Sequence, residues 1–240
     1  MKKIVCLSLI LMMALSLFAC TEPQTPAGNP NDKDTTTKSE GVMTWAEYVA
    51  AENGAAVVIE AYVQGNQSWW NGAMKVYAQD GVGGYFIWDL PCTEEESKKL
   101  TPGTKIRVSG YKATYDGEVE ITDATYEIID GYYVAEAVDV TAKLSSADLI
   151  NYMNMKVAFK ELTFVSLEYK GGKPGDDIYV KFSYNGNHYD FCVEVYLTGT
   201  DTDVYKTVQN LKAGDIVDIE GFAYWYLENI NTHITSVTVK

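Results

Sequence analysis

An internal repeat is the feature of this sequence that most constrains its fold. The segment Leu100–Tyr111 (LTPGTKIRVSGY) returns as Leu211–Phe222 (LKAGDIVDIEGF), 111 residues further along the chain. The leucine and both glycines are kept, isoleucine and valine exchange at the β-branched positions, and tyrosine becomes phenylalanine. A repeat of this length is the size of a domain rather than of a solenoid unit. The sequence therefore predicts two copies of one domain.

The first twenty residues have the pattern of an export signal. Met1–Lys3 is basic, Ile4–Phe18 is apolar, and the small residue Ala19 precedes Cys20. This order is typical of a secretory signal, and Leu17–Cys20 resembles the lipobox of bacterial lipoproteins. That resemblance implies cleavage before Cys20 and lipidation of its thiol and amino group. No aspartate follows the cysteine, which favours the outer membrane, on its periplasmic face or at the cell surface.

These features divide the N-terminal region into two predicted parts. Residues 1–19 are expected to be the lipoprotein signal peptide, and residues 20–40 the lipidated cysteine followed by a disordered tether. The tether is rich in Thr, Pro, Asn, Asp and Lys and has almost no apolar side chains to bury. The membrane would then be a partner through the N-terminal lipid. The alternative is an ordinary secretory signal that contains a cysteine.

Each copy combines a short helical segment with five strand patterns. Thr44–Glu47 is a capping box, and Asp80-Gly81 and Asn185-Gly186 are strong hairpin signals. A second capped helix is indicated between the third and fourth strands. This order is that of the OB-fold, a small Greek-key barrel. We expect an all-β chain with short helices, built from two tandem OB-fold-like five-stranded Greek-key barrels over residues 41–137 and 138–240.

A resemblance to known proteins rests on the first copy's hairpin. Gln79–Trp88 (QDGVGGYFIW), followed by the Leu100–Gly110 segment, resembles the OB-type domains of bacterial lipoproteins with tandem OB-fold-like domains. Similar domains accompany secreted endonucleases. The resemblance covers both copies, Gly41–Lys240, and implies the fold. The second copy has Tyr184–Asn187 (YNGN) in the corresponding place, so the glycine-rich hairpin belongs to the first copy alone.

No catalytic motif accompanies these domains. The sequence has two histidines, His188 and His233, and no zinc, phosphate-loop or nucleophile-elbow pattern. Cys92 and Cys192, one in each copy, are expected to be buried thiols, with a disulfide as the alternative. The acidic pairs lack the ligand spacing of a calcium loop. We therefore expect a protein that is not an enzyme and that has no metal site and no cofactor.

The charge balance bears on the choice of ligand. The chain has a formal net charge of −14, and Arg107 is its one arginine. Binding to a phosphate backbone depends on Lys and Arg side chains that displace counterions. Nucleic acid is therefore a less favoured partner, although bases could still stack on aromatic rings.

Aromatic residues form the candidate binding surface. Trp69 and Trp70 stand in a loop rich in Asn, Gly and Ser between the first two strands, and Tyr115 stands at the turn between strands four and five. In an OB-fold these loops and the face of strands two and three bind the ligand, and flat rings stack on sugars or bases. The predicted ligand contacts are Trp69, Trp70, Tyr85, Trp88 and Tyr115. For the strand residues the alternative is a place inside the barrel.

The sequence thus favours an outer-membrane-anchored lipoprotein that acts as a non-catalytic binding or accessory module for a glycan or a protein. One alternative is binding of single-stranded nucleic acid by the OB-folds. Another is a structural subunit of a surface assembly, in which the strand that ends at Lys240 pairs with a neighbour. The first copy, which has the Trp-Trp loop and the glycine-rich hairpin, is the one expected to bind.

Overall fold

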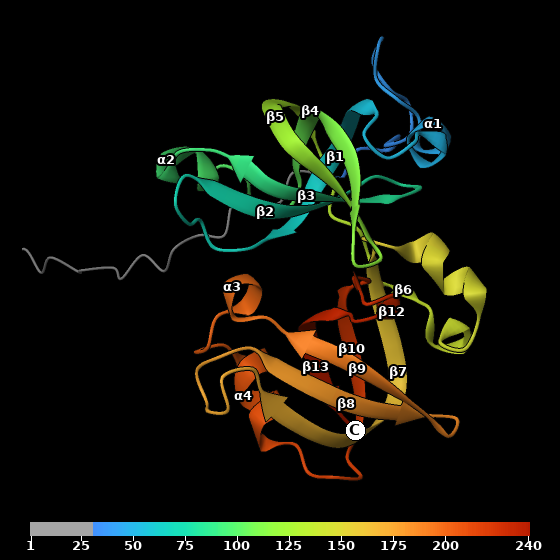
Figure 1. Cartoon of the computed structure of the whole chain (residues 1–240), viewed down its shortest axis with the longest axis vertical. Coiled ribbons are helices and arrows are strands. Elements are labelled where there is room, and N and C mark those ends of the chain that lie inside the picture. The colour runs from blue at the N-terminus through green and yellow to red at the C-terminus, as the bar shows by residue number, and fades with distance from the viewer. Residues whose placement is uncertain (1–30) are drawn as a thin grey trace, which may run out of the picture.

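The computed structural model describes residues 31–240, which form two β-barrels, one above the other in Figure 1. The predicted signal peptide, Cys20 and the first part of the predicted tether lie outside the described residues. Within residues 31–240, no helix has the length and apolar character needed to cross a membrane.

The first barrel is a closed ring of five strands. Its elements are α1 (Trp45–Ala50), β1 (Ala56–Asn66), β2 (Ala73–Gln79), β3 (Gly84–Pro91), α2 (Glu94–Ser97), β4 (Thr104–Tyr115) and β5 (Glu118–Tyr132). The strands follow the order β1-β2-β3-β5-β4, and β4 closes the ring on β1. β3 and β5 run parallel, while the other neighbours are antiparallel. This is the OB strand order that the sequence predicts.

The second barrel repeats that order. Its elements are β6 (Val138–Asp139), η1 (Thr141–Lys143), η2 (Ala147–Tyr152), β7 (Lys156–Tyr169), β8 (Ile178–Tyr184), β9 (Asn187–Val193), α3 (Val195–Thr198), α4 (Asp203–Asn210), β10 (Ile216–Phe222), β11 (Trp225–Tyr226), β12 (Asn229–Ile230) and β13 (His233–Val239). The sheet runs β10-β13-β9-β8-β7, and pairing of β10 with β7 closes the ring. The short strand β6 adds to β7. The second copy opens with 3₁₀ turns where the first has an α-helix.

The glycines of the repeated segment have the same two roles in both barrels. Gly103 and Gly214 each have a φ of +97°, a backbone conformation that other residues rarely adopt. Gly110 and Gly221 lie at irregularities in strand pairing, where a Cβ would overlap a backbone oxygen of the neighbouring strand. The repeat is therefore a folding element at the entrance and at the bend of the fourth strand.

The prediction of a disordered tether over residues 20–40 is wrong for residues 31–40, which lie against the first barrel. The Asp32 amide donates to the Tyr132 carbonyl at 2.7 Å, and the Tyr62 hydroxyl donates to the Asp32 carboxylate at 2.8 Å. Lys38 forms an ion pair of 2.6 Å with Asp80, with both side chains buried. We name residues 31–40 the N-terminal strap. Its polar side chains are ordered because they pair with groups on the barrel.

Candidate functional site

The face at which an OB-fold binds its ligand is covered in the first barrel by the second barrel. Tyr77 of β2 and Phe86 of β3 point outward from the first core and form a buried cluster with Phe222 of β10. The rings of Tyr77 and Phe222 stack with centroids 4.2 Å apart and an interplanar angle of 5°. β2 accordingly lies on the side of the first barrel that faces the second (Figure 1). The expected ligand face of strands two and three is therefore an interface within the chain.

Both loops beside that face also contact the second barrel. In the loop between β1 and β2, the Ser68 amide donates to the Tyr196 carbonyl of α3 at 2.6 Å. In the turn between β4 and β5, the Asp116 carbonyl accepts from the Glu228 amide at 3.3 Å. Figure 1 shows this hairpin reaching toward β12. A ligand cannot bind between the two loops of the first barrel unless the barrels separate.

Buried titratable groups lie in the interface. The Tyr77 hydroxyl is 2.5 Å from Nδ1 of His233, and burial lowers the pKa of His233 to about 3. Gln67 donates to the Glu194 carboxylate at 2.5 Å, while burial, with a smaller contribution from Asp177, raises the pKa of Glu194 to about 7. Burial thus favours the neutral form of both groups, as expected for charges removed from water.

Glu118, at the start of β5, is the second acidic group of the interface. It is fully buried and accepts a hydrogen bond from the Trp225 amide of the second barrel at 2.8 Å. Burial raises the pKa of Glu118 to about 8. A protonated carboxyl at neutral pH therefore joins the barrels at this point.

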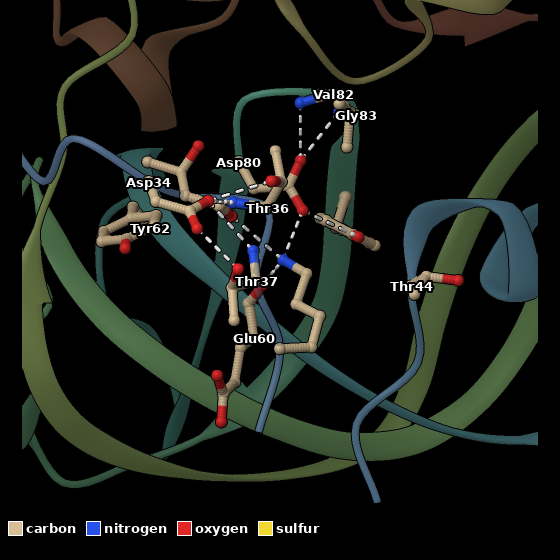
Figure 2. Close-up of polar contacts among 12 residues, drawn as sticks. Asp34, Thr36, Thr37, Thr44, Glu60, Tyr62, Asp80, Val82 and Gly83 are labelled. Carbon is tan, nitrogen blue, oxygen red and sulfur yellow. Dashed lines mark hydrogen bonds and ion pairs between the residues drawn. The ribbon is translucent and has the colours of Figure 1, made fainter. Parts of the chain in front are cut away.

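The glycine-rich hairpin of the first copy is a structural junction. Asp80 is fully buried and accepts from the amides of Val82 and Gly83 at 2.8 and 2.9 Å, which fixes the turn between β2 and β3 (Figure 2). Its second oxygen accepts from Lys38 Nζ at 2.6 Å and from the Tyr85 hydroxyl at 3.3 Å. The hairpin therefore holds the N-terminal strap on the barrel.

The remaining residues of this motif lie against three other segments. A Cβ on Gly81 would meet the strap, one on Gly83 would overlap the indole of α1, and one on Gly84 would overlap the backbone of Asn154 in the second barrel. Gln79 accepts a backbone hydrogen bond of 2.8 Å from the second barrel. Close approach of backbone and rings therefore requires these glycines, and the exposed YNGN turn of the second copy has no such neighbours in residues 31–240.

The predicted contact residues differ in how exposed they are. Trp70 is 76% exposed, and Trp88 is 36% exposed with Lys75 Nζ 4.1 Å from the centroid of its ring. Trp69 is half-buried and donates from its indole to the Cys92 carbonyl at 2.8 Å. Tyr115 is 59% exposed and is the last residue of β4, next to Asp116, whose carbonyl contacts the second barrel.

The prediction that Tyr85 contacts a ligand needs correction. Its side chain is 0% exposed and belongs to the core of the first barrel. Its ring packs edge-on against Trp45, with centroids 5.2 Å apart, and against Tyr48, with centroids 4.9 Å apart. The alternative reading for strand aromatics, a place inside the barrel, describes Tyr85.

The second barrel has an open cleft that the sequence analysis did not identify. It has a volume of about 460 Å³ and lies between η2, the start of β9 and the turn between β11 and β12. We name it the second-barrel cleft. Its polar and aromatic lining includes His188, Asp190, Tyr226, Glu228, Asn229 and Asn231. Tyr226 is 48% exposed, so its ring is free to contact a ligand.

The cysteines and histidines that the sequence analysis considered do not form a reactive or metal-binding site in residues 31–240. Cys92 and Cys192 are both buried and free, so the alternative of a disulfide between them is not realised. His188 is exposed at the β8–β9 hairpin, while His233 is buried in the interface. Residues 31–240 contain no group of three or more His, Cys, Asp or Glu side chains that could hold a metal ion.

Comparisons with known proteins identify no family for this chain. The sequence matches no protein-family model and no curated protein. Similar solved structures include the asparaginyl-tRNA synthetase of Entamoeba histolytica, at 15% identity and a TM-score of 0.31, covering 42% of this chain and 28% of the synthetase. A murine DNA-binding protein bound to double-stranded DNA matches at 10% identity and a TM-score of 0.36, covering 76% of this chain and 94% of that one.

A replication protein A heterotrimer bound to single-stranded DNA matches at 12% identity and a TM-score of 0.33, and the match covers 79% of this chain and 49% of that chain. This chain thus spans less than a third of the synthetase and about half of the replication protein chain. At such identities and TM-scores, the likeness indicates nothing about what this chain binds.

Proposed function

We propose that this chain is an exported, lipid-anchored and non-catalytic binding protein whose ligand is a glycan held in the second-barrel cleft. The observation that carries the proposal is a difference in access between the expected ligand face of the first barrel and the second-barrel cleft. The first is covered by the second barrel through Tyr77, Phe86 and Phe222, while the cleft beside β9 is open.

The lining of the second-barrel cleft suits a sugar. Tyr226 offers a flat, half-exposed ring, and rings of this kind stack on the apolar faces of sugars. The same cleft has the carboxylates of Asp190 and Glu228 and the amide of Asn229. The carboxylates can accept hydrogen bonds from sugar hydroxyls, and the amide can both accept and donate them. The volume of about 460 Å³ is within the roughly 300–1,000 Å³ range of small-ligand pockets.

Membrane anchorage is part of the proposal and rests on the sequence. The basic start, the apolar run and Cys20 support a lipidated N-terminus. Labelling with a radioactive fatty acid tests it directly: the wild type should incorporate label, and Cys20→Ser should not. Label on both proteins, or on neither, would contradict lipidation at Cys20.

Nucleic acid remains the second candidate ligand because exposed rings such as Trp70 and Trp88 could stack on bases. The net charge of −14 opposes it, since phosphate binding relies on basic side chains. Assembly through the last strand is also not favoured, because β13 lies between β10 and β9 and α4 packs beside it.

Binding to an array of glycans and single-stranded oligonucleotides tests these ligands together. The wild type should bind a glycan, Tyr226→Ala should lose that binding, and the exposed control Tyr111→Ala should keep it. Loss on Trp70→Ala instead would place the ligand on the first barrel. Binding to oligonucleotides that weakens steeply with salt would support nucleic acid, and no glycan binding by the wild type would contradict the proposal.

A further inference from the structure

Strand β5 of the first barrel has one edge that is only partly covered. Near its start it pairs with β3 at Glu120 and Ile121. From Ala124 to Asp130, its neighbour in backbone pairing within residues 31–240 is β4 alone. The other edge of this stretch therefore has no strand beside it in the part of the chain that the structure describes. An edge of this kind is a template on which another strand can pair.

The strands β3 and β5 part where both backbones bend. Asp89 of β3 has a φ of +46° and Asp123 of β5 has a φ of +48°, a left-handed conformation that residues other than glycine seldom adopt. Each aspartate lies at an irregularity in strand pairing, that of β3 with β2 and that of β5 with β4. The open edge is therefore built into the backbone of the barrel.

A groove runs along this open edge. It has a volume of about 430 Å³ and is lined by five consecutive residues of β5, Ala124–Ile128, by Pro91 at the end of β3, and by Glu96 and Lys99 in and after α2. Side chains of a strand alternate between its two faces, so a groove on one face would touch every second residue. Contact with five residues in a row therefore places the groove along the edge, where it can receive an extended chain.

The charges around the groove indicate which chain would bind. The exposed acidic residues along β5 and α2 are Asp123, Glu127, Asp130, Glu94, Glu95 and Glu96. Lys98 and Lys99 stand beside them, while Arg107 of β4 already pairs with Glu60 at 2.7 Å. A second copy of this chain would bring the same acids to the edge, and like charges oppose strand pairing. The acidic edge therefore suits a basic partner.

We propose that the open edge of β5 binds an extended basic peptide segment of another protein, which adds to the first barrel as a further strand. Its main chain would hydrogen-bond to residues 124–130, and its alternate side chains would reach the carboxylates or the apolar surface of the groove. Ile128 supplies such a surface, because it lines the groove and is 45% exposed. This site is distinct from the second-barrel cleft and does not depend on glycan binding there.

Fluorescence anisotropy of the purified full chain with a labelled peptide of alternating lysine and valine tests the proposal. The peptide should bind saturably, with one molecule per chain. The same peptide N-methylated at every backbone amide keeps its charges and side chains but cannot donate main-chain hydrogen bonds, so it should bind at least about tenfold more weakly. A glutamate–valine peptide should also bind more weakly. Hydrogen exchange of residues 124–130 should slow when the lysine–valine peptide binds.

A matched pair of variants locates the binding. Lys99→Trp places a ring in the groove and should abolish peptide binding. Lys98→Trp, one residue earlier and outside the groove, is the control and should bind as the wild type does. Both lysines are exposed and both changes remove one positive charge, so the fold should survive in each, and thermal unfolding checks this. Tyr226→Ala should leave peptide binding unchanged, which separates this site from the glycan proposal.

Four results would overturn the proposal. The first is absence of saturable binding of the lysine–valine peptide by the wild type. The second is equal binding of the N-methylated peptide, which would show that charge alone attracts it. The third is equal binding by the wild type and Lys99→Trp. The fourth is self-association of the wild type that Lys99→Trp abolishes, because the edge would then be an interface between copies of this chain.

Discussion

The hydroxyl of Tyr77 in the first barrel lies 2.5 Å from Nδ1 of His233 in the second, and both side chains are buried. The contact joins residues 156 positions apart and lies beside the stacked rings of Tyr77 and Phe222. It ties the two barrels at the surface where an isolated OB-fold would bind a ligand.

Removing this hydroxyl should weaken the association of the barrels. Tyr77→Phe keeps the ring stacked on Phe222 but leaves Nδ1 of His233 buried without its partner. Such a loss typically costs about 1–3 kcal/mol. Urea unfolding should report a lower free energy of unfolding for this variant, while the exposed control Tyr111→Phe should be unchanged. Equal stability of Tyr77→Phe and the wild type would contradict the role given to this bond.

Stability should fall as pH rises above about 6.5 because of buried carboxyls in the interface. Burial raises the pKa of Glu118 to about 8 and that of Glu194 to about 7. Between the ordinary carboxyl pKa and these values, the folded state holds protons that the unfolded state has released. The free energy of unfolding should therefore decrease with pH, by up to roughly 1.4 kcal/mol per pH unit for each carboxyl. His233 acts in the opposite direction, but only below its ordinary pKa, because burial lowers its pKa to about 3.

The variant Glu118→Gln tests how much Glu118 alone contributes to this pH dependence. The amide mimics the protonated carboxyl and can still accept from the Trp225 amide. When the pH is raised from 6.5 to 8, the melting temperature of this variant should fall less than that of the wild type. The same slope in both proteins would show that Glu118 does not cause the pH dependence, and a wild-type melting temperature that rises over this range would contradict both assignments.

The N-terminal strap should depend on its buried ion pair. Lys38→Met leaves the Asp80 carboxylate buried without its cation, and breaking a buried pair in this way costs about 3–5 kcal/mol. Limited proteolysis should cut residues 31–40 faster in this variant. Lys33→Met, at an exposed position in the same segment, is the control. The double variant Lys38→Met/Asp80→Asn should recover part of the lost stability, since it removes the unpaired charge as well.

The glycines of the first hairpin should differ in their tolerance of a methyl group. At Gly84 a Cβ would overlap the backbone of Asn154, whereas at Gly81 it would meet only the side chains of Thr35 and Thr36. Gly84→Ala should therefore push the barrels apart and lower the melting temperature, while Gly81→Ala should have a smaller effect. The reverse order of melting temperatures would contradict the close packing of the barrels at Gly84.

The strand order of both barrels could be predicted because local signals determine it. The hairpin at Asp80-Gly81, the capping box at Thr44 and the repeated Leu-x-x-Gly segments each report on a few neighbouring residues, and the structure has them in the expected places. The exposed ring of Trp70 was also expected from its loop composition.

The interface between the barrels was not predicted, because it depends on partners far apart in the sequence. One signal was present: Tyr85–Trp88 is an uninterrupted apolar run, and a strand with apolar side chains on both faces is covered on both. Nothing in the sequence predicted the ion pair between Lys38 and Asp80, because a lysine in a polar segment is expected to be exposed to solvent. The second-barrel cleft was overlooked for a related reason, because its lining comes from η2, β9 and the β11–β12 turn, which only the fold brings together.

Hydrogen exchange of the Trp225 and Lys156 amides tests most directly whether the second barrel covers the ligand face of the first. Both amides belong to the second barrel and donate to side chains of the first, Glu118 and Gln79, at 2.8 Å. If the interface is closed in solution, they should be protected about as well as amides in the cores of the barrels. Exchange as fast as that of the exposed β8–β9 turn at Asn185 would contradict the account, because the barrels would then be apart and the first ligand face open.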